Sequence, residues 1–202
     1  MSDAAASLRL PVVPQSRVDV RPIDWSGLTK RFMNPGELEV LIALVRRVSP
    51  KVVIEVGVNE GRTAKAIMQN VEGIERYQGV DVEAGYVPAM KVQRNERPER
   101  PGWMAADDPR FELILRPRGS LDLEPRDLAE CDVMFIDGDH GHAAVRHDIR
   151  LAEALVQPGG MIIYHDYHDL GTVDVKTVLE ERSARGFHIQ HVAGTWLAFE
   201  RR

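Results

Sequence analysis

The feature that most constrains the fold is a repeated alternation between short runs of β-branched residues and segments with helical periodicity. The strand-like runs are Lys51–Val56, Tyr77–Val80, Phe111–Leu115, Asp132–Ile136 and Met161–Tyr164. The helix-like segments between them are 62–70, 86–95, 121–129 and 142–156. Such an alternation is typical of a parallel sheet whose right-handed crossovers cover both of its faces with helices. The sequence therefore predicts a doubly wound α/β domain.

Both ends of this repeat are predictable as well. A helix is expected from Gly36 to the Ser49-Pro50 stop, and another over Val173–Arg185, closed by Gly186. Pro158-Gly159-Gly160 predicts a turn before the fifth strand. The last two strands, Phe187–Val192 and Thr195–Glu200, are separated only by Ala193-Gly194, which predicts a hairpin. One strand of an otherwise parallel sheet should therefore run antiparallel.

The first 34 residues show weak periodicity and contain three prolines, Pro11, Pro14 and Pro22, and Pro35 follows them directly. We expect an N-terminal arm or cap over residues 1–34, and one domain over 35–202. The arm contains Trp25, Leu28, Phe32 and Met33 without a strand of its own to pair with. An exposed apolar arm usually packs on something. It is expected to cap the rim of the site or a neighbouring subunit of a homo-oligomer.

Charge and composition exclude several classes of function. The net charge is −5, so no global field favours nucleic acid or an anionic membrane. No apolar run approaches the length of a membrane span, and the N-terminus lacks the apolar stretch of a signal peptide. The single cysteine, Cys131, precedes an apolar run and is expected to be a small buried hydrophobe. A cytoplasmic protein that acts on a small molecule follows as the expectation.

The first motif with chemical content is Glu55-Val56-Gly57-Val58-Asn59-Glu60-Gly61, between a strand and a helix. Open α/β sheets bind nucleotides at this position. Gly57 permits the tight turn, and the helix start offers free N–H groups to a carboxylate. The third glycine of a dinucleotide fingerprint is missing, and two acidic side chains would repel a pyrophosphate. The loop suits a cofactor with an amino group and a sulfonium, although a turn without a ligand remains an alternative.

Two further positions fit the same cofactor. Asp81 follows the second strand, where a carboxylate can accept hydrogen bonds from both ribose hydroxyls. Its alternative is a solvated turn aspartate. Gly119 and Ser120 follow the third strand, where a small hydroxyl residue can contact the adenine edge. A helix N-cap is the other interpretation of Ser120.

The sharpest motif is a pair of polar clusters that end the fourth and fifth strands. They read Phe135-Ile136-Asp137-Gly138-Asp139-His140 and Tyr164-His165-Asp166-Tyr167. In a parallel sheet the carboxyl ends of adjacent strands lie side by side, so Asp137, His140, His165 and Asp166 should converge at one rim. Carboxylates and imidazole are ligands of divalent metals. The alternative is that these residues cap the helices that follow.

Taken together, EVGVNEG, GVD, RGS, FIDGDHGHAAVRHDI and QPGGMIIYHDY resemble a class I S-adenosylmethionine (SAM)-dependent methyltransferase. The similarity runs from about Val52 to the C-terminus. It is greatest to the family of metal-dependent O-methyltransferases of antibiotic biosynthesis, with catechol-type enzymes as distant relatives. The resemblance implies a Rossmann-like, doubly wound, seven-stranded and mostly parallel sheet, whose C-terminal antiparallel hairpin places the last strand between the fifth and sixth.

The resemblance also implies roles for individual residues. The cofactor-binding set is Glu55, Gly57, Asn59, Gly61, Thr63, Asp81, Gly119, Ser120 and Asp137. Asp137, His165 and Asp166 match the metal ligands, and His140 matches a position that some relatives use as general base, so Asp137 and His140 form the catalytic pair. Asn59 stands where many members have glycine. His165 stands where a carboxylate is usual, so a softer divalent metal becomes an alternative to magnesium or manganese.

The expected reaction is methyl transfer from SAM to a hydroxyl oxygen of a small-molecule acceptor. A divalent metal on Asp137, His165 and Asp166 would bind that oxygen and lower its pKa, and His140, with an ordinary pKa near ~6.5, would take the proton. Two other classes stay open. One is an NAD-dependent oxidoreductase, which the acidic loop disfavours. The other is a non-catalytic SAM-fold binding module, which would keep the Gly57 loop and need no metal.

Overall fold

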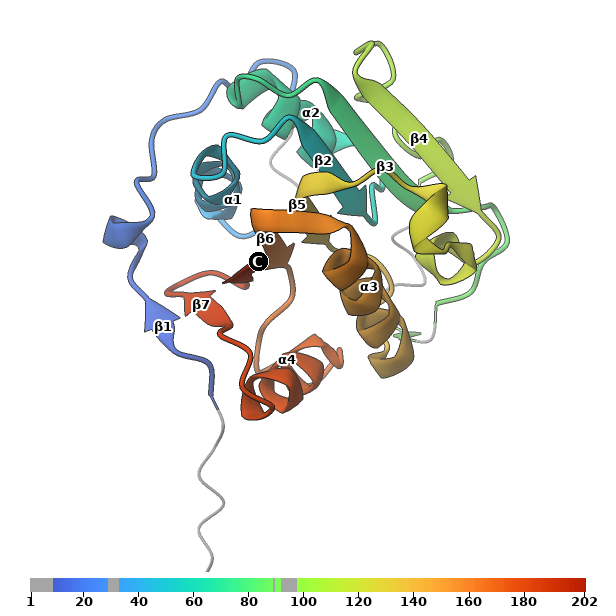
Figure 1. Ribbon diagram of the computed structural model, residues 1–202. Helices are drawn as coiled ribbons and strands as arrows, with labels where there is room; N and C mark the ends of the chain where they lie inside the picture. Colours follow the sequence, from blue (N-terminus) through green and yellow to red (C-terminus); the bar gives the residue numbers. More distant parts are fainter. Residues whose placement is uncertain (1–8, 29–32, 89, 92–97) are drawn as a thin grey trace, which may run out of the picture.

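The computed structural model describes residues 9–28, 33–88, 90–91 and 98–202. Within them, eight strands form one sheet in the order β1-β7-β8-β6-β5-β2-β3-β4 (Figure 1). The strands are β1 (Val12–Val13), β2 (Val52–Val56), β3 (Arg76–Val82), β4 (Phe111–Arg116), β5 (Cys131–Ile136), β6 (Val156–Tyr164), β7 (Gln190–Val192) and β8 (Ala198–Arg201). Only β8 runs antiparallel to its neighbours, β6 and β7. The strand β8 lies between β6 and β7, which are the fifth and sixth of the seven strands expected from the sequence, so its predicted place is confirmed.

Helices cover both faces of this sheet. In the described part of the chain, the α-helices are α1 (Glu37–Arg46), α2 (Arg62–Asn70), α3 (His142–Leu155) and α4 (Val175–Ala184), and short 3-10 helices include η1 (Gln15–Arg17), η3 (Gly119–Asp122) and η4 (Pro125–Asp127). Figure 1 shows α1 on one side of the central strands and α3 on the other. The predicted α/β class and doubly wound architecture are confirmed.

The two faces are built by the alternation of side chains along each strand. In β5, Val133 and Phe135 belong to the core cluster with α1 and α2, while Met134 and Ile136 belong to the cluster with α3 and α4. Strand β6 repeats this division, with Ile163 on the first face and Ile162 on the second. Central strands buried on both faces explain why the sequence shows continuous apolar runs there. Cys131 is one of these buried core residues, as expected.

The sheet changes its winding direction between β2 and β5. Strands β3 and β4 extend from β2 toward one edge, whereas β5 returns to the other side of β2 and is followed by β6. The carboxyl ends of β2 and β5 therefore form a topological switch point, where open α/β sheets bind ligands. The two ends are in register, with Val56 opposite Ile136, and the N–H of Asp137 donates to the Val56 carbonyl at 2.8 Å.

Several predicted boundaries are wrong. The sheet has eight strands and not seven, because Val12–Val13 of the N-terminal segment pairs in parallel with β7. Residues 121–129 form no α-helix: η3 ends at Asp122, the chain is extended at residues 123 and 124, and the second 3-10 helix, η4, begins at Pro125. Residues 158–160 lie inside β6, which begins directly after α3 and shifts its register against β5.

Some other predictions concern residues that lie partly outside the described part of the chain. Residues 86–88 are not helical, and most of the remaining predicted helix 86–95 lies outside the described part of the chain. In the N-terminal segment, Trp25, Leu28 and Met33 pack against the core cluster of the α1 face, while Phe32 lies outside the described residues. The division of the chain at residue 34 stays a prediction. No helix among the described residues is both long and apolar enough to cross a membrane.

Candidate active site

A cavity of about 580 Å³ opens at the carboxyl ends of the central strands. Its wall includes ten of the residues singled out from the sequence: Gly57, Asn59, Thr63, Asp81, Gly119, Ser120, Asp137, His140, His165 and Asp166. Its volume lies in the range of small-molecule sites in proteins. Glu55 and Gly61, the other two candidates, do not line it.

The loop after β2 forms one wall of the cavity. Gly57 has φ +90°, and a Cβ at this position would lie 2.0 Å from the Asp137 carbonyl oxygen, so only glycine fits between the ends of β2 and β5. Asn59 also adopts positive φ, which asparagine tolerates better than most residues. At Gly61, which has φ +85°, a Cβ would lie 2.9 Å from the Gly102 carbonyl oxygen, so this position is closely packed against residue 102.

Asp81 fixes this loop from the neighbouring strand. Its Oδ2 accepts a hydrogen bond of 2.6 Å from the Asn59 N–H, and its Oδ1 accepts one of 2.7 Å from the Val82 N–H. Burial raises the pKa of Asp81 above its ordinary value, although these N–H donors oppose the shift. Asp81 lies within β3 and faces the cavity, so it is not the solvated turn residue of the alternative interpretation.

Glu55 is a buried carboxyl under the loop. The hydroxyl of Tyr77 donates to its Oε2 at 2.9 Å. Burial raises the pKa of Glu55 well above its ordinary value, and the nearby Asp137 and Asp81 raise it further. Glu55 therefore sits behind the cavity wall, hydrogen-bonded to Tyr77.

Gly119 and Ser120 lie in η3 on the opposite wall of the cavity. Ser120 is inside this short helix and buried, so it is not an N-cap. Nearby, the Tyr86 hydroxyl donates to Oδ2 of Asp139 at 2.5 Å, and both residues line the same cavity.

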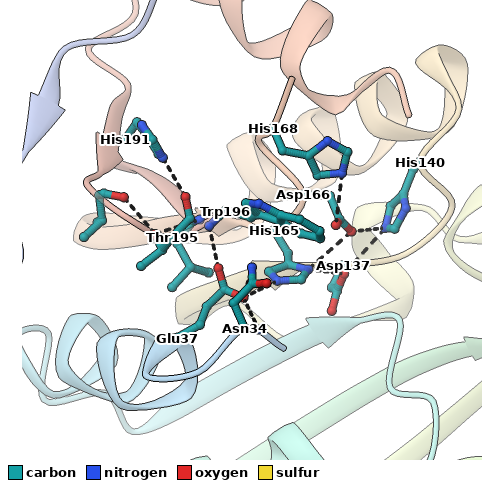
Figure 2. A network of polar contacts seen from close by, with 12 residues as sticks. Asn34, Glu37, Asp137, His140, His165, Asp166, His168, His191, Thr195 and Trp196 are labelled. Carbon is teal, nitrogen blue, oxygen red and sulfur yellow. Dashed lines mark hydrogen bonds and ion pairs between the residues drawn. The ribbon is translucent and has the colours of Figure 1, made fainter. Parts of the chain in front are cut away.

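The polar clusters after β5 and β6 converge, as the strand order requires (Figure 2). Nε2 of His140 lies 3.1 Å from Oδ2 of Asp166 and 3.5 Å from Oδ1 of Asp137. One ligand atom from each of these three residues falls within 4.8 Å of the others, an arrangement that can hold a metal ion. The backbone of Asp166 has φ +57°, a strained conformation that turns the chain sharply at the end of β6.

His165 is enclosed by carboxylates on both edges of its ring. Its Nδ1 lies 3.2 Å from Oδ1 of Asp137 and 3.3 Å from Oδ2 of Asp166, and its Nε2 lies 3.2 Å from Oε2 of Glu37. Burial alone would lower the pKa of His165, but the carboxylates outweigh it and raise this pKa well above the ordinary value. The pKa of Asp137 is lowered in turn, because the two imidazoles outweigh its burial.

A comparison with protein families identifies the domain that contains this cavity. A model of the methyltransferase domain family matches residues 54–167, which is more than half of the chain and spans β2 to the end of the Asp166 cluster. The chain belongs to the methyltransferase domain family. No curated protein matches it.

Solved structures share the fold of this methyltransferase. Cofactor-bound Rv0187 from MTB is 16% identical, with a TM-score of 0.61, and the match covers 87% of this chain and 84% of that one. An O-methyltransferase from Bacillus cereus in complex with SAH is 15% identical, with a TM-score of 0.57 and coverage of 88% and 86%. The O-methyltransferase TomG from Streptomyces achromogenes, in complex with SAM, is 15% identical, with a TM-score of 0.56 and coverage of 84% and 81%.

The methyltransferase assignment made from the sequence is thus confirmed at the level of family and fold. It argues against the NAD-dependent oxidoreductase. The roles of individual residues stay predictions, but the geometry shows which of these residues lie together. The predicted ligands Asp137 and Asp166 meet as expected, whereas both His140 and His165 place a nitrogen beside them.

Sequence reasoning missed several residues of this methyltransferase site. Asn34, Tyr86, His168 and Trp196 line the cavity, and Glu37 lies behind it. The rings of His168 and Trp196 lie 4.3 Å apart and form an aromatic wall beside Asp166. Nothing in the local pattern marks Glu37, because an acidic residue in the first turn of a helix is ordinary.

Proposed function

We propose that this methyltransferase transfers the methyl group of SAM to a hydroxyl oxygen of a small-molecule acceptor, with the assistance of a divalent metal. The proposal is carried by one observation: Asp137, His140, His165 and Asp166 converge in the cavity that also contains the Gly57 loop and Asp81. The names of the B. cereus and S. achromogenes structures, both O-methyltransferases, support an oxygen acceptor.

The donor fits the β2 side of the cavity. Both oxygens of Asp81 accept backbone hydrogen bonds, but a carboxylate has about four acceptor sites, so Asp81 can still accept a hydrogen bond from the ribose of SAM. The N–H groups in the first turn of α2, near Thr63, suit the carboxylate of the methionine part. Gly119 and Ser120 lie where the adenine edge would reach. The sulfonium would then point toward Asp137.

The donor set fits a divalent cation. Two carboxylates and an imidazole suit manganese, iron, cobalt, nickel or zinc as well as magnesium. Asp137 and Asp166 would hold the ion together with His165. Bound there, the ion would supply Lewis-acid activation of the acceptor hydroxyl by lowering its pKa.

The remaining steps belong to residues of the chain. The cavity walls hold the acceptor oxygen in line with the methyl group, which is the main task, because the sulfonium already activates the methyl. The O–CH₃ bond forms as the S–CH₃ bond breaks, and the hydroxyl proton passes to the imidazole of His140. The neighbouring carboxylates of Asp137 and Asp166 stabilise the imidazolium that results, and they raise the pKa of His140 against its burial.

Two measurements on the wild-type protein test this function. Titration calorimetry with SAM, SAH and NAD should show binding of the first two only. Methyl transfer from labelled SAM to a panel of hydroxylated small molecules should stop with a strong chelator and return with added Mn²⁺. Turnover that resists the chelator contradicts the metal, and NAD binding without SAM binding contradicts the donor. SAM binding without transfer to any acceptor would favour the non-catalytic module.

A further inference from the structure

Glu37, the first residue of α1, is a fully buried carboxylate that touches three separate segments of the chain (Figure 2). Its Oε1 accepts a hydrogen bond of 2.5 Å from the Trp196 N–H. Its Oε2 accepts hydrogen bonds from the backbone N–H of Asn34 at 3.0 Å and from the Asn34 side-chain amide at 3.3 Å. The same Oε2 lies 3.2 Å from Nε2 of His165. A buried carboxylate with this many partners has a defined position.

The contacts of Glu37 determine which nitrogen of His165 carries hydrogen. An ionised carboxylate has only acceptor sites, so Nε2 of His165 must donate to Glu37. In the neutral ring the hydrogen is then on Nε2, and the lone pair is on Nδ1. The hydrogen bond made by one ring nitrogen commonly fixes the tautomer of a histidine in this way.

That lone pair points at the two candidate carboxylate ligands. Nδ1 of His165 lies 3.2 Å from Asp137 and 3.3 Å from Asp166. Three acceptor atoms cannot face one another at this distance, so without a metal Nδ1 carries a hydrogen that the carboxylates accept, and a metal ion bound here would replace that hydrogen. Ligand atoms at about 2.1 Å from one metal ion are themselves about 3.0–3.4 Å apart in octahedral or tetrahedral geometry. The observed separations match this range.

We propose that Glu37 is a positioning residue that holds His165 in its Nε2–H tautomer and presents Nδ1 to the metal, which leaves His140 to accept the proton of the substrate. This inference rests on the proposed metal-assisted function and deepens it. A carboxylate that accepts the outer N–H of a metal-binding histidine raises the basicity of the ring and fixes its orientation. Glu37 also joins this histidine to Asn34 and Trp196 of the cavity wall, so metal binding and the shape of the acceptor site are coupled through one side chain.

The first test compares two buried carboxylates. Glu37→Gln should weaken Mn²⁺ binding, measured by calorimetry, by about 10- to 100-fold, the usual cost of losing an outer partner of a metal ligand. Its affinity for SAM should stay within twofold of wild type. Glu200→Gln is the matched control, because Glu200 is also buried but is bound by Tyr164 and Arg182, which do not line the cavity. Its Mn²⁺ affinity should be unchanged.

A second test separates positioning from a general structural role. In the His165→Ala background, Glu37→Gln should change Mn²⁺ affinity less than twofold, because Glu37 affects the metal only through the imidazole of His165. In the wild-type protein loaded with Zn²⁺, long-range ¹H–¹⁵N correlation of labelled histidine should show His165 as the Nε2–H tautomer. This spectrum tests the predicted tautomer of His165 even if the Glu37→Gln variant does not fold.

The outcomes are distinguishable. Wild-type Mn²⁺ binding with an unchanged Glu37→Gln affinity, or an Nδ1–H tautomer of His165, overturns the role of Glu37 and leaves the proposed function intact. If the wild-type protein binds SAM but none of Mn²⁺, Zn²⁺ or Mg²⁺, metal assistance itself fails and the role of Glu37 falls with it.

Discussion

The carboxylate of Asp81 accepts a 2.6 Å hydrogen bond from the backbone N–H of Asn59, so the end of β3 holds the loop that follows β2. Asp81 therefore has two tasks in the proposed site: it shapes the loop, and it offers its remaining lone pairs to the cofactor ribose. The strand order makes this possible, because β2 and β3 are parallel neighbours in register up to Val56 and Val80.

Asp81→Ala should weaken SAM binding by about 10- to 100-fold, since hydrogen bonds to a charged group contribute about 1.5–3 kcal/mol. Calorimetry with SAM and SAH measures the effect. Glu83→Ala, an exposed carboxylate just after the same strand, is the control and should bind SAM like wild type. Equal affinities for both variants would remove Asp81 from the proposed ribose site.

Asp166→Asn tests the metal site with the least disturbance of the backbone. Residue 166 has φ +57°, a conformation that asparagine accepts, whereas alanine would add strain. Because a neutral amide is a weaker ligand than a carboxylate, Mn²⁺ affinity should fall about 10- to 100-fold. Turnover should fall with it and recover in part at high Mn²⁺, while SAM affinity stays within twofold. A loss of turnover that excess metal does not relieve would assign Asp166 another role.

The parts of the site that follow strand ends were predictable from the sequence. Gly57, Asp81, Asp137 and Asp166 each lie at or just after the end of a strand, so a correct strand assignment and a parallel sheet are enough to bring them together. The chain reversal between β4 and β5 then places Asp137 next to Gly57. Local sequence patterns were thus enough to predict both the fold and the residues at the centre of the cavity.

The residues that were missed depend on pairings between distant parts of the chain. Glu37 meets His165 across 128 residues and Trp196 across 159, and no local periodicity contains that information. The same holds for β1, a two-residue strand whose pairing with β7 depends on where the C-terminal hairpin lies. Short pairings of this kind have too little sequence pattern to be recognised.

Gly57→Ala should destabilise the fold strongly and not merely weaken ligand binding. The new methyl would lie 2.0 Å from a backbone carbonyl oxygen of residue 137, which cannot move without disturbing β5. We expect a loss of about 2–5 kcal/mol in the free energy of unfolding, from backbone strain and overpacking together. Gly186→Ala is the control: its φ of +96° is similar but nothing lies within 4 Å, so only about 1–2 kcal/mol should be lost. Equal melting temperatures for the two variants would contradict the close approach of β2 and β5.

Asp148 gives the protein a pH-dependent loss of stability. This carboxyl of α3 is fully buried, and burial raises its pKa to about 7 against a smaller opposing effect of the Ser120 hydroxyl. Below about pH 4 both the folded and the unfolded chain keep its proton, so the group costs nothing there. Between about pH 4 and 7 only the unfolded chain releases it, so stability falls as the pH rises.

Above about pH 7 the loss is complete and amounts to roughly 4 kcal/mol, from about 1.4 kcal/mol for each pKa unit of difference. Asp148→Asn removes the titrating group while keeping its size. In urea unfolding at pH 5, 6, 7 and 8, the variant should therefore gain stability relative to wild type as the pH increases, with the largest difference at pH 8. Asp107→Asn, at an exposed position, controls for the removal of one negative charge. Parallel pH profiles of wild type and Asp148→Asn would show that the carboxyl of residue 148 is not held protonated by the fold.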